Sequence, residues 1–364
     1  MCRELISKGI DVLLVTTDAD LELKENLPAQ INYNNVPRLF FSSQAGSSFK
    51  YSRSMAKWLD HNVNKFDLVH VHAVFNHACI SATRSCRKRN VPYVVRPLGT
   101  LDPWSMSQKR FKKRLFWIVA GRSMIRNSAG IHYTSEAEKF RTETTLNLRR
   151  GAVVPLGIEI SLSDPQSGEI EFQDNFVDIS RRPYVLVLSR LDPKKGIPPL
   201  IRSFLSLRSE ARFSDWQLVI AGTGKPEYRV FLEEFVREQG GAGAVHFTGW
   251  LSGEQKAAFL QNAGLLALTS YQENFGLCVM EAMSFGVPVL VSSHVDLSSE
   301  VLRTNAGWVV DVEEPSLTRG LSEALSSKDE RCLRGNAGRE LSKLFSWDRI
   351  GNDLIRMYSD ISPK

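Results

Sequence analysis

The chain has 364 residues, of which 43% are hydrophobic and 24% charged, so it is long enough for two folded domains of ordinary size. Its five cysteines are odd in number and form no C-x-x-C pair, which excludes a disulfide framework and a cysteine zinc site and predicts reduced thiols in the cytoplasm. The formal charge of +6 is a mild basic excess that favours an anionic ligand or surface without requiring either.

Short β-rich runs alternate with helical patterns along the whole chain. Several runs, such as YVLVLS and WQLVIAG, are almost continuously apolar, which is typical of parallel strands covered on both faces. The alternation predicts the α/β class, with doubly wound parallel sheets. In chain order, the expected strands are 10–16, 67–72, 93–96, 130–133, 152–154, 184–189, 216–221, 245–247, 265–268, 287–291 and 308–310.

A polar, acidic segment of little periodicity, 156–183, divides these strands into two series and is typical of a linker. The closing stretch, WDRIGNDLIRMY, has the apolar spacing of a helix. The expected organisation is therefore an N-terminal domain, a linker, a C-terminal domain and a closing helix. Their bounds are 1–160, 161–182, 183–346 and 347–364.

Residues 265–286 form the first stretch that indicates chemistry. The apolar run LLAL, the loop TSYQENF and a helical run follow one another, so the loop lies where open α/β sheets bind ligands. Main-chain N–H groups near Gly276 and Leu277 then point toward an anion, and the Glu281 carboxylate suits the paired hydroxyls of a sugar or ribose. The alternative is that Glu273 and Glu281 only complement the helix dipole.

Three further strand ends are candidates for the same site. Arg190 ends an apolar strand, Lys194 and Lys195 follow it in a Pro-Gly loop, and such cations suit a diphosphate. AGTGK and HFTGW follow the next two strands, and their glycines, Gly222 and Gly249, allow close approach of a ligand to the backbone. A solvated basic loop is the alternative for the first of these stretches. Taken together, cations, a helix N-terminus and paired acids are the parts that a nucleotide-sugar site needs.

In this order, SRLDPKKG, AGTGK, HFTGW and the Glu273-x7-Glu281 stretch resemble the retaining glycosyltransferases of family four, which have the GT-B fold. The N-terminal half agrees through DLVHVHAVFNH, VPYVVRPLGTLDPW and VVPLGIE, and its second stretch looks like a subgroup that builds bacterial surface polysaccharides. The resemblance implies two Rossmann-like domains facing a cleft. The C-terminal domain takes a nucleotide-diphosphate sugar, the N-terminal domain takes the acceptor, and the closing helix returns to the N-terminal domain.

The resemblance also implies roles for individual residues. Arg190 and Lys195 neutralise the diphosphate, Glu281 takes the ribose hydroxyls and Glu273 takes hydroxyls of the transferred sugar. The remaining donor-binding residues that it implies are Gly222, Gly249, Phe275, Gly276 and Leu277. The cations stabilise the charge that builds on the departing diphosphate, so neither a metal nor another cofactor is expected.

The N-terminal half departs from the family pattern in two places. The loop after the third expected strand reads RPLG and lacks the family's histidine, which leaves His72, Arg96 and Asp102 as acceptor-side candidates. The family's first strand and glycine-rich loop have no counterpart before CRELISKG. We therefore expect the neighbouring strands to lack a partner and transfer by this chain to be poor. A fuller reading frame is expected to begin roughly 25–40 residues upstream.

Other functions fit the sequence less well. His70, His72 and His77, or Asp18-Ala19-Asp20, imitate metal ligands, but cleft-lining or structural histidines and an ordinary turn are the simpler readings. The stretch 108–126 holds seven Lys or Arg and no acid, which suits anionic lipid or a solvated helix face, whereas nucleic acid is not expected as a partner.

The predicted function is transfer of a sugar to a glycan or lipid-linked acceptor. The alternatives are a GT-B sugar-nucleotide epimerase and a non-catalytic sugar-nucleotide-binding protein. The expected location is the cytoplasm, at the inner face of the plasma membrane.

Overall fold

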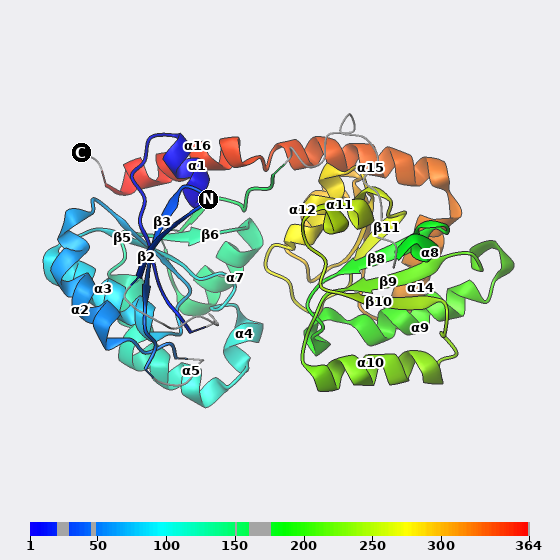
Figure 1. The fold of residues 1–364 in the computed structure, drawn as a ribbon, viewed down its shortest axis with the longest axis horizontal. Helices are drawn as coiled ribbons and strands as arrows, with labels where there is room; N and C mark the ends of the chain where they lie inside the picture. Colours follow the sequence, from blue (N-terminus) through cyan, green and yellow to red (C-terminus); the bar gives the residue numbers. More distant parts are fainter. Residues whose placement is uncertain (20–28, 45–48, 150, 160–175, 363–364) are drawn as a thin grey trace. The chain divides into compact units, whose positions relative to one another are not determined.

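The computed structural model describes residues 1–19, 29–44, 49–149, 151–159 and 176–362 (Figure 1). Contacts divide the chain into unit 1, which is Met1–Gly157 together with Trp347–Lys364, and unit 2, which is Ile158–Ser346. Most of the expected linker, 161–182, lies outside the described residues. Among the described residues, no helix is long and apolar enough to cross a membrane.

Unit 2 contains one six-stranded sheet in which every neighbouring pair is parallel. Its central strands are apolar and fully buried, as expected for strands covered on both faces. In spatial order the strands are β10 (Val245–Gly249), β9 (Gln217–Ala221), β8 (Tyr184–Leu188), β11 (Leu265–Leu268), β12 (Val289–Ser292) and β13 (Gly307–Val310).

Helices cover both faces of this sheet, which gives the doubly wound arrangement (Figure 1). On one face lie α9 (Ile197–Arg208), α10 (Pro226–Glu238) and α14 (Glu314–Ser326). On the other lie α11 (Gly253–Gln261), α12 (Leu277–Ser284) and α15 (Lys328–Lys343). The shorter helices are α8 (Val177–Ser180), α13 (Ser298–Thr304), η6 (Pro193–Lys195) and η7 (Ala211–Phe213).

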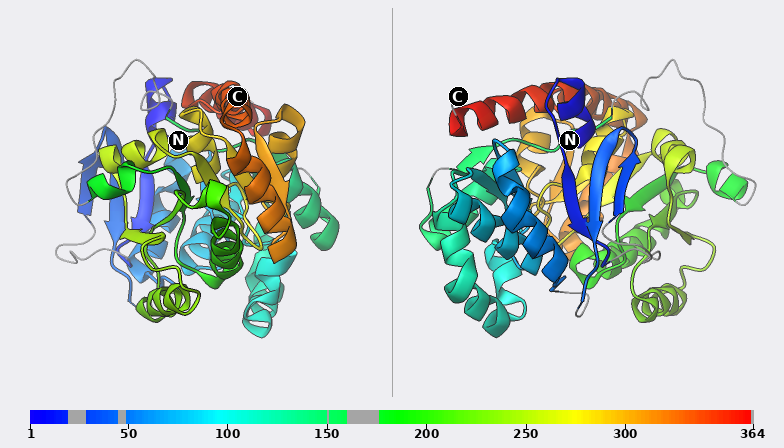
Figure 2. Two further views of the ribbon diagram at one scale, coloured as in Figure 1. Left: turned by 90° about the vertical axis from the view of Figure 1, so that its right-hand side faces the viewer. Right: turned by 60° about the vertical axis from the view of Figure 1, so that its left-hand side comes forward.

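Unit 1 has two separate sheets. The four-stranded parallel sheet runs β4 (Val69–His72), β5 (Tyr93–Arg96), β6 (Gly130–Tyr133) and β7 (Gly151–Val153). The three-stranded sheet runs β1 (Leu14–Thr17), β3 (Val36–Phe41) and β2 (Ala29–Tyr33) and comes forward in the right-hand view of Figure 2. The parallel sheets of both units confirm the predicted α/β class.

The three-stranded sheet corrects the prediction in two ways. The strand expected at 10–16 begins only at Leu14, and the antiparallel pair β2–β3 was not predicted. The turn of that pair is Asn34–Asn35, with φ angles of 50° and 59°. A two-residue asparagine turn between strand-like runs is a known hairpin signal, which our reading of the sequence did not use.

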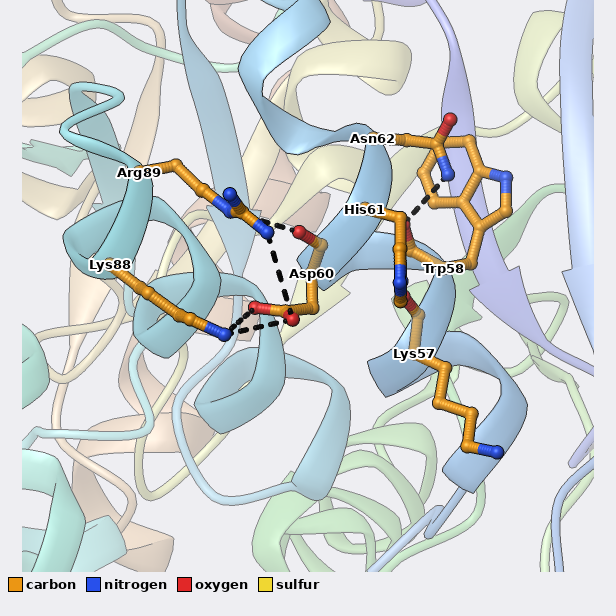
Figure 3. A network of polar contacts seen from close by, with 7 residues as sticks. All are labelled: Lys57, Trp58, Asp60, His61, Asn62, Lys88 and Arg89. Carbon is orange, nitrogen blue, oxygen red and sulfur yellow. Dashed lines mark hydrogen bonds and ion pairs between the residues drawn. The ribbon is translucent and has the colours of Figure 1, made fainter.

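The two sheets of unit 1 leave a gap between them. β1 and β4 are edge strands, and a cavity of about 480 Å³ lies between them, lined by every residue of both strands. Side chains of α2 (Arg53–Asn62) and α3 (His77–Arg89) form its wall. These two helices are joined at the surface, where Asp60 Oδ1 accepts a 2.9 Å bond from Lys88 and its carbonyl accepts one of 3.1 Å from Arg89 (Figure 3).

The closing helix, α16 (Trp347–Ile361), belongs to unit 1. Its apolar side chains Ile350, Leu354 and Met357 pack with Leu5 of α1 (Cys2–Ser7) and with residues of β5 and the end of β7. The other helical elements of unit 1 are η1 (Val63–Lys65), α4 (Pro103–Ser107), α5 (Arg110–Phe116), the π-helical turn η2 (Trp117–Gly121), α6 (Arg122–Arg126) and α7 (Glu136–Leu146).

Candidate functional site

The donor-side candidates gather at the carboxyl edge of the unit 2 sheet, where the loops after β8, β9 and β11 are bonded to one another. Leu191 N donates to Thr223 O at 2.9 Å, and Tyr271 N donates to Lys194 O at 2.8 Å. A Cβ at Gly222, whose φ is +141°, would lie 1.9 Å from Ser189 O, so this close approach requires glycine. Backbone contacts therefore link the loops at this edge.

Three predicted charges lie in this edge. Lys195 Nζ forms an ion pair with Glu273 Oε2, and both side chains are largely buried, at 11% and 20% exposed. Arg190 is exposed, and its guanidinium has no partner in the described part of the chain. Burial lowers the pKa of the neighbouring Lys194, and the nearby charges of Glu273, Lys195 and Arg190 also act on it. These four groups share one electrostatic environment, with one cation facing solvent.

The N-terminus of α12 lies beside this ion pair. Gly276 is the N-cap residue with a φ of +76°, a conformation that favours glycine, and a Cβ there would lie 3.2 Å from the Leu268 side chain. Phe275 is buried and Leu277 is exposed. Burial raises the pKa of Cys278 to about 12, so this thiol stays protonated and is not a nucleophile at neutral pH.

Glu281 in the second turn of α12 has a partner that the sequence did not reveal. Lys256 Nζ on α11 donates to Glu281 Oε1 at 2.8 Å, and both side chains are about one-third exposed. Glu281 Oε2 has no protein partner among the described residues, so it remains open to a ligand hydroxyl. Nothing in the run GEQKAAFLQ identifies Lys256, because the two residues meet only when α11 packs against α12.

Gly249 closes the same edge on the β10 side. Gly222 N donates to Gly249 O at 2.7 Å, and Gly249 has a φ of +75°. Its Cβ position is almost open, with Arg229 Nη1 nearest at 3.9 Å. The donor-side residues predicted from the sequence therefore all lie at one edge of unit 2, but their binding roles stay predictions.

The acceptor-side candidates lie in unit 1. His72 and Arg96 are register partners on β4 and β5, so they occupy the same face of the sheet near its carboxyl edge. Arg96 is only 5% exposed, and its Nε and Nη2 atoms have no hydrogen-bond partner among the described residues. Burial lowers the pKa of Arg96 to about 10 and, with the charge of Arg96, that of His72 to about 4. The His72 side chain nevertheless keeps an accessible edge, which lines the cavity between β1 and β4.

Asp102 has structural partners at both carboxylate oxygens. Its Oδ1 caps α4 by accepting from Trp104 N at 3.1 Å, and its Oδ2 accepts from Arg141 Nε at 2.5 Å. These contacts hold the end of the loop that begins after β5. An acceptor-side role for Asp102 stays a prediction.

The RPLG loop is held by a residue that the sequence reading missed. Leu98 and Gly99 have φ angles of +56° and +70°, which is a strained conformation for leucine. Glu138 is fully buried and accepts from Gly99 N at 2.6 Å and Thr134 N at 2.8 Å. A buried carboxylate that accepts main-chain N–H groups fixes this loop. Only its spacing after Ser135, the N-cap of α7, was visible in the sequence.

His70, His77 and His132 have protein partners. His70 Nδ1 is 2.7 Å from Tyr358 Oη, its Nε2 is 3.2 Å from His132 Nδ1, and His132 Nε2 is 2.7 Å from Val154 O. In the described ranges, no group of three or more His, Cys, Asp or Glu is arranged to hold a metal ion. Asp18 is buried and accepts from Ser43 N at 2.7 Å, and Asp20 lies outside the described residues.

Comparison with known families identifies both halves of the chain. The model of the group 1 glycosyl transferases matches residues 169–341, and the model of glycosyltransferase family 4 matches residues 1–162. An uncharacterized glycosyltransferase of Methanocaldococcus jannaschii is 30% identical over 177 residues, which are 48% of this chain and 44% of that protein. A D-inositol 3-phosphate glycosyltransferase of Salinispora tropica is 29% identical over 222 residues, which are 58% of this chain and 46% of that protein. The chain thus spans about half the length of these relatives.

Solved structures share the fold. Sucrose-phosphate synthase from Thermosynechococcus elongatus has a TM-score of 0.79 at 20% identity, covering 99% of this chain and 91% of that one. Anabaena HepE in complex with UDP and glucose has a TM-score of 0.75 at 19% identity, and the match covers 90% of this chain and 87% of that one. With both family models and two Rossmann-like units, the chain belongs to the family-four type of glycosyltransferases with the GT-B fold.

Proposed function

We propose that this protein transfers a sugar, with retention of anomeric configuration, from a nucleotide-diphosphate sugar bound by unit 2 to an acceptor bound by unit 1. The observation that carries the proposal is the edge of the unit 2 sheet. There the Lys195–Glu273 ion pair, the unpaired Arg190 and the open N-terminus of α12 lie together. In an α/β sheet this edge is where ligands bind.

Each group at this edge has a chemical use for such a donor. Arg190 and Lys195 lie where they can neutralise a diphosphate and stabilise the charge that develops on it as the sugar leaves. Once Lys195 turns to phosphate, Glu273 is freed for sugar hydroxyls. Glu281 keeps one oxygen on Lys256 and offers the other to the ribose. Because these cations supply the charge stabilisation, the proposal needs no metal, and chelating agents should leave transfer unchanged.

The acceptor is proposed to be a glycan or lipid-linked molecule used for surface polysaccharide. The support is the resemblance of the RPLGTLDPW region to proteins of that kind. His72 and Arg96 are the acceptor-side residues that we propose, because two buried donor groups of Arg96 have no partner in the part of the chain that the structure describes. The matched relatives named for D-inositol 3-phosphate act on a different acceptor class, and phosphorylated polyols are therefore the first alternative acceptors to test.

The first experiment identifies the donor. Melting temperatures are measured with uridine, guanosine and adenosine diphosphate sugars, because a ligand that binds only the folded state raises the melting temperature. The best donor is then titrated by calorimetry into the wild type, Arg190→Ala and Glu281→Ala. Each substitution should weaken binding by about 1.5–3 kcal/mol. Arg303→Ala and Glu254→Ala, at exposed positions of unit 2, are the matched controls.

Unchanged affinity in both site variants would remove the roles proposed for Arg190 and Glu281. Product anomers determined by NMR test retention. Epimerised donor formed without acceptor would instead identify a GT-B epimerase. Tight donor binding without transfer, hydrolysis or epimerisation would identify a binding protein.

A further inference from the structure

The helical segment 110–126 of unit 1, formed by α5, η2 and α6, is apolar on two opposite faces. Its inner face carries Phe116 and Trp117, which pack on the core of unit 1, with the Phe116 ring 5.2 Å from that of Phe75. Its outer face carries Phe111, Leu115, Ile118 and Val119, which are 88%, 65%, 66% and 73% exposed. A helix that is apolar all round is normally buried, so we expect the outer face to contact another surface.

The outer apolar residues form one stripe. Phe111, Leu115 and Ile118 follow the i, i+4, i+7 spacing of a single helix face, and Val119 widens it. Lys112 and Arg114 flank the stripe on its two sides and Arg122 continues it. None of these three cations has a side-chain partner among the described residues. An apolar stripe bordered by cations is the pattern of a helix that lies in the plane of a membrane interface.

Charge selects among the surfaces that such a stripe could bind. The sequence has no Asp or Glu between residues 103 and 135, so the segment presents a purely cationic border. Lys113 is an exception, because its Nζ bonds to Ser105 O at 2.5 Å and lies 5.1 Å from the Phe75 ring centroid, inside the unit. Nucleic acid would match the cations but leave four large apolar side chains uncovered. A bilayer with anionic headgroups matches both.

We propose that this outer face docks on an anionic lipid bilayer, with Phe111, Leu115, Ile118 and Val119 inserted at the acyl boundary and Lys112, Arg114 and Arg122 at the headgroups. The proposal is independent of donor binding, since every residue that it uses lies in unit 1. It predicts two separable contributions to the affinity for the bilayer. The contribution of the cations weakens with salt, whereas that of the apolar side chains does not.

The test is co-sedimentation of the full chain with vesicles of phosphatidylcholine alone or with one-third phosphatidylglycerol, at low and high salt. The stripe variant is Phe111→Ser, Leu115→Ser, Ile118→Ser. The charge variant is Lys112→Gln, Arg114→Gln, Arg122→Gln. The matched controls, at exposed positions of unit 2, are Leu302→Ser, Leu333→Ser and, separately, Arg237→Gln, Arg303→Gln, Arg319→Gln.

The wild type should bind the anionic vesicles, and the charge variant should bind them about a hundredfold more weakly at low salt. The stripe variant should bind the anionic vesicles about tenfold or more weakly than the wild type at both salt concentrations. Both controls should bind them like the wild type. Because the substituted side chains are exposed, thermal melts should be unchanged in every variant.

Equal binding to neutral and anionic vesicles, or a stripe variant that binds like the wild type, would overturn the proposal. Two further measurements test whether a second copy of the chain or a nucleic acid binds this outer face instead of a bilayer. A dimer in sedimentation velocity that the stripe variant abolishes would assign the face to a second copy. A shift of duplex DNA or RNA without vesicle binding would assign it to nucleic acid, and either result would replace the bilayer.

Discussion

In unit 2 the strands at the centre of the sheet are apolar and the charged residues lie in the loops that follow them, whereas in unit 1 the strands themselves carry ionisable side chains. His70, His72, Arg96 and His132 all belong to β4, β5 and β6. Burying such groups costs free energy unless they are bonded, and Arg96 keeps two buried nitrogens without a partner. The Lys195–Glu273 pair at the rim of unit 2 can exchange partners with a ligand at much lower cost.

This contrast separates two kinds of functional residue. Charges at a sheet edge can be removed with little effect on the fold, so their loss appears in binding and rate. Charges inside a sheet contribute to both stability and function, so their removal changes both. The predictions below use this difference, beginning with the largest expected effect.

Removal of the rim cations should affect catalysis more than stability. Lys195→Ala and Arg190→Ala should each lower the rate of transfer about 10²–10³-fold, because each removes charge stabilisation from the departing diphosphate. The free energy of unfolding should change by less than about 1 kcal/mol in Arg190→Ala, whose side chain is exposed, and by more in Lys195→Ala, which leaves the largely buried Glu273 carboxylate without its partner. Initial rates with the best donor and urea denaturation measure the two quantities. A rate loss matched by an equal loss of folded protein would mean that the rim is structural.

Removal of the buried carboxylate of unit 1 should affect stability first. Glu138→Ala leaves Gly99 N and Thr134 N without their acceptor and should cost about 3 kcal/mol. Hydrogen exchange in unit 1 should accelerate, while donor affinity at unit 2 stays constant. Glu136→Ala, an exposed acid in the first turn of the same helix, is the control. Equal stability of the two variants would show that Glu138 does not hold the RPLG loop.

Acid should destabilise unit 1 more than unit 2. Burial lowers the pKa of His132 to about 3 and that of His72 to about 4, below the unfolded value near 6.5. The unfolded chain therefore binds more protons, so the stability is fully present above pH 6.5 and is lost as the pH falls toward 3. His132, which is 1% exposed, contributes a slope of about 1.4 kcal/mol per pH unit within that window, and the exposed His72 contributes less.

Hydrogen exchange followed between pH 7 and pH 4 measures the effect separately in each unit. Four histidines of unit 1 and His246 of unit 2 have lowered pKa values, each with burial as its main cause. His132→Asn should flatten the slope of unit 1. If stability fell equally with pH in both units, the prediction that acid destabilises unit 1 more than unit 2 would be wrong.

The smallest effect is expected at the Lys256–Glu281 pair. Lys256→Ala removes an ion pair whose side chains are about one-third exposed, and it should change stability by at most about 1 kcal/mol. Donor affinity should then fall much less than in Glu281→Ala, because the proposed ribose contact belongs to the carboxylate. Calorimetric titration of the two variants decides this. Equal losses of affinity would mean that Glu281 acts only through its ion pair.

Much of unit 2 could be predicted from the sequence because its strands are short, apolar and regularly spaced. The runs 184–189 and 216–221 became β8 and β9 almost unchanged. The loops after them were also predictable, because parallel strands bring their carboxyl ends to one edge. What remained hidden were side-chain partners from distant segments. Lys256 meets Glu281 and Glu138 meets Gly99 only after helices pack against loops.

Unit 1 was less predictable for a different physical reason. Its strands are interrupted by polar residues, so hydrophobic periodicity located β4, β5 and β6 but missed β2 and β3. The Asn34–Asn35 turn was the available signal for that hairpin. The division into two sheets depends on which edges find a partner in space. No local pattern encodes it.

The two segments that make up unit 1 lie on either side of unit 2 in the chain, and this has a consequence for biosynthesis. On the ribosome, residues 158–346 emerge before α16, so unit 2 can fold while unit 1 still lacks its last helix. Until then Leu5, Val94 and Val154 have no Ile350, Leu354 or Met357 to cover them. A nascent chain is therefore most exposed to chaperones and proteases through its first half, and the emergence of α16 is the step that closes unit 1.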